Sequence, residues 1–565
     1  MTTSLILPPA LILIAAGITL PLFALLRLRW LALLASPLAA LWVVLTLPDG
    51  IHLTGSFLGQ TLVLLKIDAL SRVFASVFAI MAFAGGLFAL NQKSTLELAA
   101  AFVYAGSAIG VAMAGDLITM FIYWEVMAIG STLVILSSGR NAQRAGLRYA
   151  AVHMLGGVLL MAGVAGEIAA TGSVTFSAMD LSTVPRMLIF AGFLVNVGAP
   201  PLSAWLADAY PEASWSGMVF LSAFTTKTAV YVLLRGFPGT ELLIPIGLFM
   251  VFYGIVYAIL ENDMRRILAY SIVNQVGFMV TGIGIGTEMA LNGAAAHAFT
   301  HIIYKALLLM SAGSVLYMTG KRKCTDLGGL FRTMPLTCAF GIVGALAISS
   351  FPATSGFISK SMISDAAGAE HLAFVWFALA AASAGVFLHA GIKFPWFVFF
   401  QKDSGLRPPE PPLNMLASMA LMAFFCIGLG LYPKPLYDML PYPVDYVPYT
   451  GAHVVYQLQL LLFSGLAFFL MLNLLKRTMT ITLDVDWLWR RPGHAVAKFL
   501  DSFAAYTWEW LADTVVKAAT RVHDALYRHH GPEGLFGRTW PTGTMAFWTT
   551  VTLGAVVILS YWQNA

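Results

Sequence analysis

Charged residues are scarce in this chain. Asp, Glu, Lys and Arg together make up 10% of its 565 residues, whereas an average soluble domain has about 25%. Hydrophobic residues reach 59%, and the mean hydropathy is +0.81. This composition excludes an ordinary soluble domain and predicts an all-α polytopic membrane protein.

Cysteine is almost absent as well. The three cysteines, Cys324, Cys338 and Cys426, are scattered and form no CxxC or metal-ligand cluster, so neither a disulfide framework nor an iron–sulfur site is predicted. The stretch TGIGIGTE at 281–288 contains glycines but lacks the strand–turn–helix context of a nucleotide-binding motif, and we interpret it as a loop. We expect no cofactor, no metal and no nucleic-acid partner.

Long apolar stretches occupy most of the sequence. Each is about 20 residues long, enough to cross the hydrocarbon core of a bilayer as a helix. The first is followed rather than preceded by basic residues, unlike a cleaved signal peptide, so we expect it to be retained. Together they predict about 16 transmembrane helices, at residues 4–25, 30–48, 69–91, 96–115, 117–137, 146–170, 186–207, 214–234, 241–260, 266–284, 289–318, 335–366, 371–400, 413–433, 453–475 and 544–562.

Basic residues alternate between the predicted loops and indicate the orientation of the chain. The loops on one face hold little beyond Lys66, Arg186 and Arg235. The positive-inside rule assigns the other, basic-rich face to the cytoplasm, which places the N-terminus outside a bacterial inner membrane. We call this second face the basic face. Its loops contain Arg27, Arg29, Lys93, Arg140, Arg144, Arg148, Arg265, Arg266, Lys321, Arg322, Lys323, Arg332, Lys402, Arg407, Lys476 and Arg477.

Two of the predicted spans contain helix-breaking residues. One holds Pro200-Pro201 in NVGAPPLSAW, and the other holds SSFPATSGF at 349–357. Unwound backbone at membrane depth is tolerated only against protein or a water-filled cavity. Because the breaks lie five spans apart, they indicate two inverted five-helix repeats with ion sites near the breaks. The alternative is a pair of incidental proline kinks.

The C-terminal tail differs from the rest. Apolar residues such as Phe499, Phe503 and Trp510 recur there at helical spacing between charged residues. The segment is too polar to span, and we expect an amphipathic helix along the cytoplasmic surface, or else a small cytosolic cap. The expected parts are N-terminal helices at 1–95, a first repeat at 96–235, a second repeat at 236–400, C-terminal core helices at 401–480, the amphipathic lateral helix at 481–540 and a final span at 541–565.

Ionisable residues inside the spans carry the functional signal. His297, His301 and Lys305, which we call the His–Lys line, are each four residues apart and so form one polar row about 12 Å long on a helix. A charge at the bilayer centre costs roughly 2.5–3.5 kcal/mol and usually faces a bundle interior or an ion path. Further residues of this kind are Glu125, Lys227 and Lys360, with His389, Lys393 and His153 as weaker members.

These residue types suit proton transfer. Burial disfavours a charged lysine and a nearby carboxylate favours it, so glutamate and lysine in one bundle make a proton site that a neighbouring charge can switch. Histidine suits a relay position because it titrates near neutrality. The row therefore predicts a lateral proton path, although any single member is equally well explained as a structural residue.

The motifs around these residues resemble the antiporter-like subunits shared by respiratory complex I, Mrp-type multisubunit cation/proton antiporters and membrane-bound hydrogenases. The stretch around 211–231 is most similar to the D-type subunit of the Mrp antiporters. The resemblance covers about residues 100–400 through YWEVMAIGS (123–131), PPLSAWLADAYPEA (200–213), LSAFTTKTAVYVLLR (221–235), DMRRILAYSIVNQVG (263–277), HAFTHIIYKALLLM (297–310) and GFISK (356–360).

The resemblance implies inverted repeats with broken helices and a hydrated axis at the membrane centre. It assigns Glu125 and Lys227 to the first half-channel, the His–Lys line to the central link, and Lys360 to the second half-channel. The chain departs from the family at Asn196, where a lysine is common, and at Ser203, where a histidine is frequent. We expect Asn196 to keep a hydrogen-bonded or hydrated link while the charge pairing moves to Glu125 and Lys227.

The expected function is that of a proton-translocating subunit of a multisubunit cation/proton antiporter, similar to the Mrp D-type subunit. Its partners would be other membrane subunits, protons, the lipid bilayer and Na⁺ or K⁺. Such a chain is a transporter subunit and no enzyme, although homology would label it an NADH dehydrogenase subunit. The alternatives are a proton-pumping subunit of a complex I-like or hydrogenase redox complex, and a proton-coupled module or scaffold of another assembly, such as one for inorganic carbon uptake.

Overall fold

A computed structural model describes residues 7–479, 483–485, 487–488 and 491–563. Residues 4–6 of the first predicted span, residue 480, residues 481–482, 486 and 489–490 of the predicted amphipathic segment, and residues 564–565 of the last part lie outside the described residues. The chain divides into two compact units, Met1–Asp486 and Trp487–Ala565. Each unit is treated by itself below.

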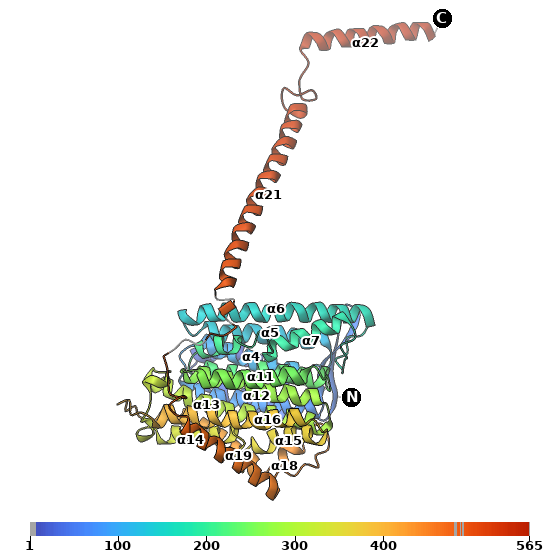
Figure 1. Ribbon diagram of the computed structural model, residues 1–565. Helices are drawn as coiled ribbons and strands as arrows, with labels where there is room; N and C mark the ends of the chain where they lie inside the picture. The colour runs from blue at the N-terminus through green and yellow to red at the C-terminus, as the bar shows by residue number, and fades with distance from the viewer. Residues whose placement is uncertain (1–6, 480–482, 486, 489–490, 564–565) are drawn as a thin grey trace. The chain divides into compact units, whose positions relative to one another are not determined.

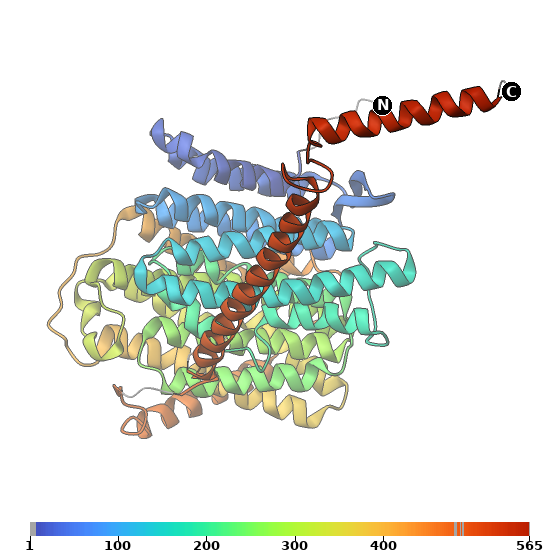
Figure 2. The ribbon, with the colours of Figure 1, turned by 90° about the horizontal axis from the view of Figure 1, so that it is seen from above.

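The predicted membrane helices are confirmed. Among the described residues, 13 helices are long and apolar enough to cross a membrane, and three shorter apolar helices match the remaining predicted stretches. The helices of the first unit are α1 (Pro9–Leu25), α2 (Arg29–Thr46), α3 (Ala69–Phe88), α4 (Thr95–Met113), α5 (Leu117–Leu136), α6 (Arg140–Thr171), α7 (Val184–Val197), α8 (Trp205–Ala209), α9 (Gly217–Leu221), α10 (Thr225–Gly236), α11 (Leu243–Leu260), α12 (Met264–Ile285), α13 (Glu288–Thr319), α14 (Pro335–Ile348), α15 (Phe357–Ala369), α16 (Ala373–Val386), α17 (Leu413–Leu431), α18 (Lys434–Tyr437) and α19 (Gly451–Leu470). Most of the long helices lie side by side with nearly parallel axes, whereas α19 runs obliquely to them (Figures 1 and 2).

Both predicted helix breaks are present. The first separates α7 from α8, and it begins at Gly198, whose φ of +81° ends α7 in the left-handed conformation that glycine adopts without strain. The second separates α14 from α15, where Ser350 and Ala353 also have positive φ. The structure adds two irregularities that the sequence did not reveal: a break between α9 and α10, and π-helical turns at Phe387–Lys393 and Trp396–Phe400 that continue α16.

The core of the first unit is built around α12 and α13. Nearly every residue of α12 and of the first 28 positions of α13 is buried. Glycines let α11 and α12 pack backbone against backbone, as small residues do in membrane bundles. A Cβ atom at Gly277 would lie 2.6 Å from the carbonyl oxygen of Gly247, and one at Gly254 would lie 2.6 Å from that of Tyr270.

The interpretation of 281–288 as a loop is wrong for its first part. Helix α12 continues to Ile285 and ends at Gly286, whose φ is +78°. The glycines in the last turns of α12 allow close packing, because a Cβ at Gly284 would lie 2.7 Å from the backbone nitrogen of Ile244 on α11. A glycine-rich helix in a tight interface therefore has the same composition as a loop.

A β-hairpin is the feature of the fold that the sequence prediction missed. Strands β1 (Gly50–Phe57) and β2 (Gln60–Ile67) pair antiparallel. Leu58 and Gly59 connect them, both with positive φ, as in the two-residue turns that match the strand twist. Within the described residues the remaining regular structure is helical, so the all-α class holds apart from this hairpin.

The second unit contains α21 (Pro492–His530), a single helix of 39 residues, and α22 (Thr542–Gln563). The tail was therefore correctly predicted to be helical. No described residue of α21 is buried within the chain. Helix α22 is one of the helices long and apolar enough to span a membrane, as expected for the last predicted span.

Candidate functional site: ionisable side chains at broken helices

Lys360 lies in the first turn of α15, directly after the second break. Its side chain is buried, and Nζ donates a hydrogen bond to the carbonyl oxygen of Ile348, the last residue of α14, at 3.2 Å. The last carbonyls of a helix lack intrahelical partners and carry partial negative charge, so they favour a cation. The ring of Phe278 lies 5.1 Å from Nζ and adds a cation–π contact.

The His–Lys line lies on α13 next to this break. His297 bonds through Nδ1 to Ser359 Oγ and through Nε2 to Gln275 Oε1, each at 3.1 Å. The hydroxyl of Tyr304 donates to the same Gln275 oxygen at 3.1 Å, and Thr300 lies 2.8 Å from Ser359. A continuous hydrogen-bonded network therefore joins α12, α13 and α15 around His297.

The other two members of the line have different surroundings. Lys305 donates to Ser271 Oγ at 2.9 Å and to the carbonyl oxygen of Leu268 at 3.4 Å. His301 is completely buried, and within the described part of the chain neither of its ring nitrogens has a hydrogen-bond partner. Buried polar atoms are nearly always satisfied by protein or by ordered water. We therefore expect water beside His301.

Lys227, the predicted lysine of the first half, also sits at a break. Its Nζ donates to the carbonyl oxygen of Ser222 at 2.6 Å and to Thr226 Oγ1 at 3.1 Å. Ser222 follows α9, so the unpredicted interruption before α10 supplies this acceptor. Lys227 and Lys360 thus share one arrangement, in which an ammonium group meets a carbonyl at a helix break.

The expected ion pair between Glu125 and Lys227 is absent. Lys227 has neutral oxygen partners, whereas Glu125 is only partly buried and packs against α6, where a Cβ added to Gly157 would collide with its Oε1. That oxygen is buried without a hydrogen-bond partner among the described residues. The sequence places both residues in one half, but their helices aim the two side chains at different neighbours.

Asn196 does make the expected hydrogen-bonded link. Its Oδ1 lies 2.8 Å from Nδ1 of His153, so the last turn of α7 is joined to α6. The imidazole is packed against Tyr149 and Trp205, with ring centroids 4.0 and 4.7 Å away. His153 Nε2 and Asn196 Nδ2 have no partner among the described residues, so we expect water as their partner. Ser203, the other departure from the family pattern, is also buried.

A row of hydroxyl groups in the first half escaped the sequence reasoning. Tyr104 and Thr225 lie 2.6 Å apart, and Tyr149 donates to Ser131 at 2.9 Å while lying 3.5 Å from Thr225. These side chains come from α4, α5, α6 and α10. Hydroxyl residues carry no periodic or charge signal, so only the packing of the helices reveals the row.

His389 and Lys393 lie in the π-helical turn after α16 and are separate from the network around His297. Lys393 Nζ donates to the carbonyl oxygens of Ala258 at 3.2 Å, of Glu261 at 2.6 Å and of Ile259. It therefore caps the C-terminal end of α11, which is a structural role. His389 bonds through Nδ1 to the carbonyl oxygen of Gly385 at 2.9 Å.

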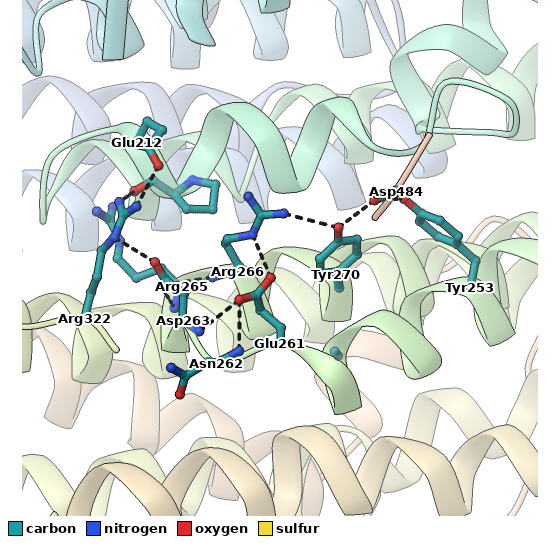
Figure 3. A network of polar contacts seen from close by, with 12 residues as sticks. Glu212, Tyr253, Glu261, Asn262, Asp263, Arg265, Arg266, Tyr270, Arg322 and Asp484 are labelled. Atoms are coloured by element: carbon teal, nitrogen blue, oxygen red, sulfur yellow. Dashed lines mark hydrogen bonds and ion pairs between the residues drawn. The ribbon is translucent and has the colours of Figure 1, made fainter. Parts of the chain in front are cut away.

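Charged residues on the basic face join the two halves. Arg322, which follows α13, pairs with Glu212 at 2.8 Å and with Asp263 at 2.7 Å (Figure 3). Arg265 donates to the carbonyl oxygens of Ala213 and Ser214, each at 2.7 Å. The loop after the first break is thereby fixed to the start of α12. Burial raises the pKa of Asp263, and the nearby Arg322 opposes that rise.

The same face holds the segment that leaves the first unit. Tyr253 of α11 and Tyr270 of α12 both donate to Oδ2 of Asp484 at 2.6 Å (Figure 3). The sequence reasoning missed this contact as well as the ion pairs. The charged run ENDMRR at 261–266 is the signal that could have pointed to a polar cluster here.

Fold and site together define a multi-pass membrane protein with ionisable groups buried at helix breaks. Residues 114–386 match the family described as NADH:quinone oxidoreductase/Mrp antiporter, TM. The resemblance inferred from the motifs is thus confirmed for this segment.

Named relatives come from both branches of the family. The chain is 32% identical over 274 residues to the D-type subunit of the Na(+)/H(+) antiporter of Alkalihalophilus pseudofirmus, covering 44% of this chain and 55% of the relative. It is 31% identical over 273 residues to the N-type subunit of the NADH-quinone oxidoreductase of Desulforudis audaxviator, covering 45% and 54%. The chain therefore spans about half the length of these relatives.

Two solved structures share the fold. The Mrp complex from Dietzia sp. superposes with a TM-score of 0.73 at 22% identity, covering 99% of this chain and 63% of the matched one. The membrane-bound sulfane sulfur reductase, an archaeal respiratory membrane complex, superposes with a TM-score of 0.70 at 23% identity, covering 97% and 99%. At this identity the likeness establishes the fold alone.

Proposed function

We propose that this chain is the proton-translocating membrane subunit of a multisubunit cation/proton antiporter, similar to the Mrp D-type subunit. The observation that carries the proposal is the pair of buried lysines, Lys227 and Lys360, each of which donates to a carbonyl oxygen at a helix break, together with the buried His–Lys line on α13. The proposed proton path consists of Glu125, Lys227, His297, His301, Lys305 and Lys360, with Asn196, His153, His389 and Lys393 as possible members.

The geometry supports a specific role for the lysines at the breaks. A charged ammonium stabilises the helix-end carbonyl to which it donates, as Lys227 does at Ser222 and Lys360 at Ile348. Loss of the proton leaves a neutral amine, which donates a weaker hydrogen bond, so water competes better for the carbonyl. Protonation of each lysine is therefore coupled to hydration of its break, and His301 with Lys305 lies on α13 between them in the proposed path.

The proposed architecture has a half-channel in each of two inverted repeats, residues 96–235 and 236–400. The matched positions of the two predicted breaks support this division. We place the basic face in the cytoplasm of a bacterial cell and the N-terminus outside. Other membrane subunits complete the transporter, and Na⁺ or K⁺ is the exchanged cation, since relatives are named as Na(+)/H(+) and K(+)/H(+) antiporter subunits.

The test is cation-driven proton release in inverted membrane vesicles that contain the chain together with the subunits encoded beside it. Lys305→Ala should abolish exchange at equal assembly, because it removes the ammonium from the buried line. Lys321→Ala, which removes an exposed lysine just after the same helix, should leave exchange unchanged. Equal exchange in the two variants would remove this chain from the proton path.

A second candidate is a proton-pumping subunit of a redox complex. The relative named as the N-type subunit of an NADH-quinone oxidoreductase favours it, because it is 31% identical to this chain over 273 residues. In that case wild-type vesicles would show no exchange with any tested cation, and proton release would require an electron donor. The same vesicles therefore separate the two candidates.

A further inference from the structure

A groove of about 770 Å³ lies between α14, the π-helical turns that continue α16, and α19. Helix α19 crosses its neighbours obliquely (Figure 1), and the crossing leaves a wedge of space that parallel packing would close. Gly391 and Gly465 lie in the lining and widen the space, because they carry no side chain. Aliphatic and aromatic side chains and one proline make up the rest of the lining. The groove therefore suits an apolar ligand.

The side of the groove is open. Leu462 and Leu466 of α19 belong to its lining and are 70% and 53% exposed. On a helix that crosses a membrane, such side chains meet lipid tails or a neighbouring helix. A ligand can therefore enter sideways from the bilayer.

The groove is about as long as one leaflet is thick. Leu458 and Phe469 are the first and last residues of α19 that line it, and helical rise separates them by about 16 Å. Half of the hydrocarbon core of a bilayer is about 15 Å. Phe351 lines the groove from the second break, whereas Phe400 lines it two residues before Lys402. The groove therefore runs from the basic face to the middle of the membrane.

Two lysines lie at the basic-face end. Lys402 follows the second π-helical turn and Lys476 follows α19. Both are exposed, and neither has an ion-pair or hydrogen-bond partner within the described parts of the chain. The backbone N–H of Ser404 and the side chain of Arg477 donate to carbonyl oxygens of the loop 327–328, each at 3.1 Å. The two lysines therefore flank one loop.

The charge around this loop favours an anion. Asp403, the acidic residue beside Lys402, is shared by two arginines, Arg332 at 3.2 Å and Arg407 at 2.6 Å. Lys402 and Lys476 thus add positive charge that this carboxylate does not neutralise. Basic residues at a membrane surface attract anionic lipid headgroups, each by a factor of about five.

The space fits an acyl chain better than a helix of a partner subunit. A helix is about 10–12 Å across with its side chains, so 16 Å of it would need more than about 1,200 Å³. The groove offers about 770 Å³. A spanning helix of a partner would also continue through both leaflets, whereas a lipid tail ends at the membrane centre, as the groove does.

We propose that this groove binds an acyl chain of an anionic phospholipid from the leaflet on the basic face, and that Lys402 and Lys476 hold the lipid phosphate. Packing against the groove differs little from packing among lipid tails, so the two lysines decide which lipid is bound. The end of the tail lies against Phe351 in the second break. This site is independent of the transport function, because it needs only the apolar lining and the placement of the lysines.

Photo-cross-linking tests the site in the purified complex reconstituted into vesicles. The probe is phosphatidylglycerol with a diazirine near the end of one acyl chain, and phosphatidylcholine with the same chain is the neutral comparison. Phosphatidylglycerol should label peptides containing Leu346 or Phe351 at least about tenfold more, since two lysines each favour the anion about fivefold. Equal labelling by the two lipids, or none at these peptides, would overturn the proposal.

The lysines are tested by removing their charge. The double variant Lys402→Gln, Lys476→Gln should lower labelling by phosphatidylglycerol to the level of phosphatidylcholine. Lys321→Gln, which removes another exposed lysine of the basic face, should leave labelling unchanged. Unchanged labelling in the double variant would overturn the assignment of the phosphate to these two lysines.

The groove itself is tested by filling it. Gly465→Leu puts a side chain into the space, where a Cβ would lie 3.4 Å from the ring of Phe387, and should lower labelling by both lipids at least about fivefold. Gly428→Leu adds the same side chain to α17, where a Cβ would meet nothing within 4 Å, and should have no effect. Equal labelling in the two variants would show that the probe binds outside the groove.

A second cross-link identifies the occupant in native membranes. With photoreactive p-benzoylphenylalanine in place of Leu462, irradiation of the whole complex should increase the mass of this chain by that of one phospholipid. A cross-link to another subunit, or to a second copy of this chain, would mean that protein fills the groove and would overturn the proposal.

Discussion

At the two predicted helix breaks, different kinds of hydrogen-bond donor bind the carbonyl oxygen at the end of the preceding helix. At the first, the carbonyl oxygen of Val195 near the end of α7 accepts a hydrogen bond from the indole of Trp205 at 3.0 Å. At the second, the carbonyl oxygen of Ile348 accepts one from the ammonium of Lys360 at 3.2 Å. An indole keeps its hydrogen at any physiological pH, whereas an ammonium can lose one. The second break alone is therefore suited to respond to a proton.

The two halves also differ in how their polar groups connect. In the second half, hydrogen bonds continue from Ser359 through His297 to Gln275. In the first half, the His153–Asn196 pair has no direct bond to Lys227 in the described structure. The first half therefore depends more on water to complete a path. Removing a titratable group should thus cost more at the second break than at the first.

The largest expected effect comes from removing the charged donor at the second break. Lys360→Met should lower exchange by at least about 10²-fold, the contribution of a positioned proton-transfer group. Trp205→Phe removes the neutral donor at the first break and should keep most of the exchange, at a stability cost of about 1 kcal/mol. Exchange rates in vesicles and thermal unfolding of the purified complex measure both. If Trp205→Phe lowered cation/proton exchange as much as Lys360→Met, the two breaks would not differ in their dependence on a charged donor.

A smaller effect is expected from placing charge in the first half. Asn196→Asp puts a carboxylate in place of the amide whose Oδ1 lies 2.8 Å from Nδ1 of His153, in a buried position, where the negative charge would hold a proton on the imidazole. We expect exchange to slow by roughly tenfold, as for loss of a proton-transfer step. Ser203→Ala in the adjacent break is the control. Normal exchange in assembled Asn196→Asp would show that charge at this position is unimportant.

Removing the hydrogen bonds that join the two halves should lower the thermal stability of the complex rather than its transport rate. Arg265→Met leaves the carbonyls of Ala213 and Ser214 without their buried donor and should cost about 2 kcal/mol or more. Arg332→Met removes an arginine whose side chain is 58% exposed and should cost less than about 0.5 kcal/mol. The midpoint of thermal unfolding of the complex compares them. Equal midpoints would mean that Arg265 does not hold the halves together.

The smallest expected effect concerns the segment around Asp484. Tyr270→Phe removes one of two hydroxyl donors to this carboxylate and should cost about 0.5–1.5 kcal/mol. Hydrogen–deuterium exchange at residues 483–485 should become faster, while Tyr317→Phe, at the end of α13, should not change it. If hydrogen–deuterium exchange at residues 483–485 were unaltered in Tyr270→Phe, the hydroxyl of Tyr253 alone would be enough to hold Asp484 in place.

Much of the fold was readable because it depends on local composition. Apolar length located the spans, and Pro200-Pro201 and the stretch 349–357 located the breaks. Composition gave a wrong prediction where tertiary packing determines the structure. The glycines within 281–285 predicted a loop, but they lie in α12 and allow its close contact with α11. The hairpin at 50–67 was missed although Ile51, Leu53 and Phe57 alternate with polar residues, because the search was for apolar stretches long enough to span a membrane and the hairpin lies between two of them.

For the candidate site, the sequence by itself determined that Lys227, Lys360 and the three members of the His–Lys line are buried, because a charge inside an apolar span has nowhere else to go. Only the tertiary structure decided what each one contacts. In the structure, Lys227 donates to a carbonyl oxygen rather than pairing with Glu125, Lys393 caps the C-terminal end of α11, and Lys360 lies beside a polar cavity. The reason is physical: hydropathy is a property of one segment, whereas a hydrogen-bond partner comes from whichever helix packs against it.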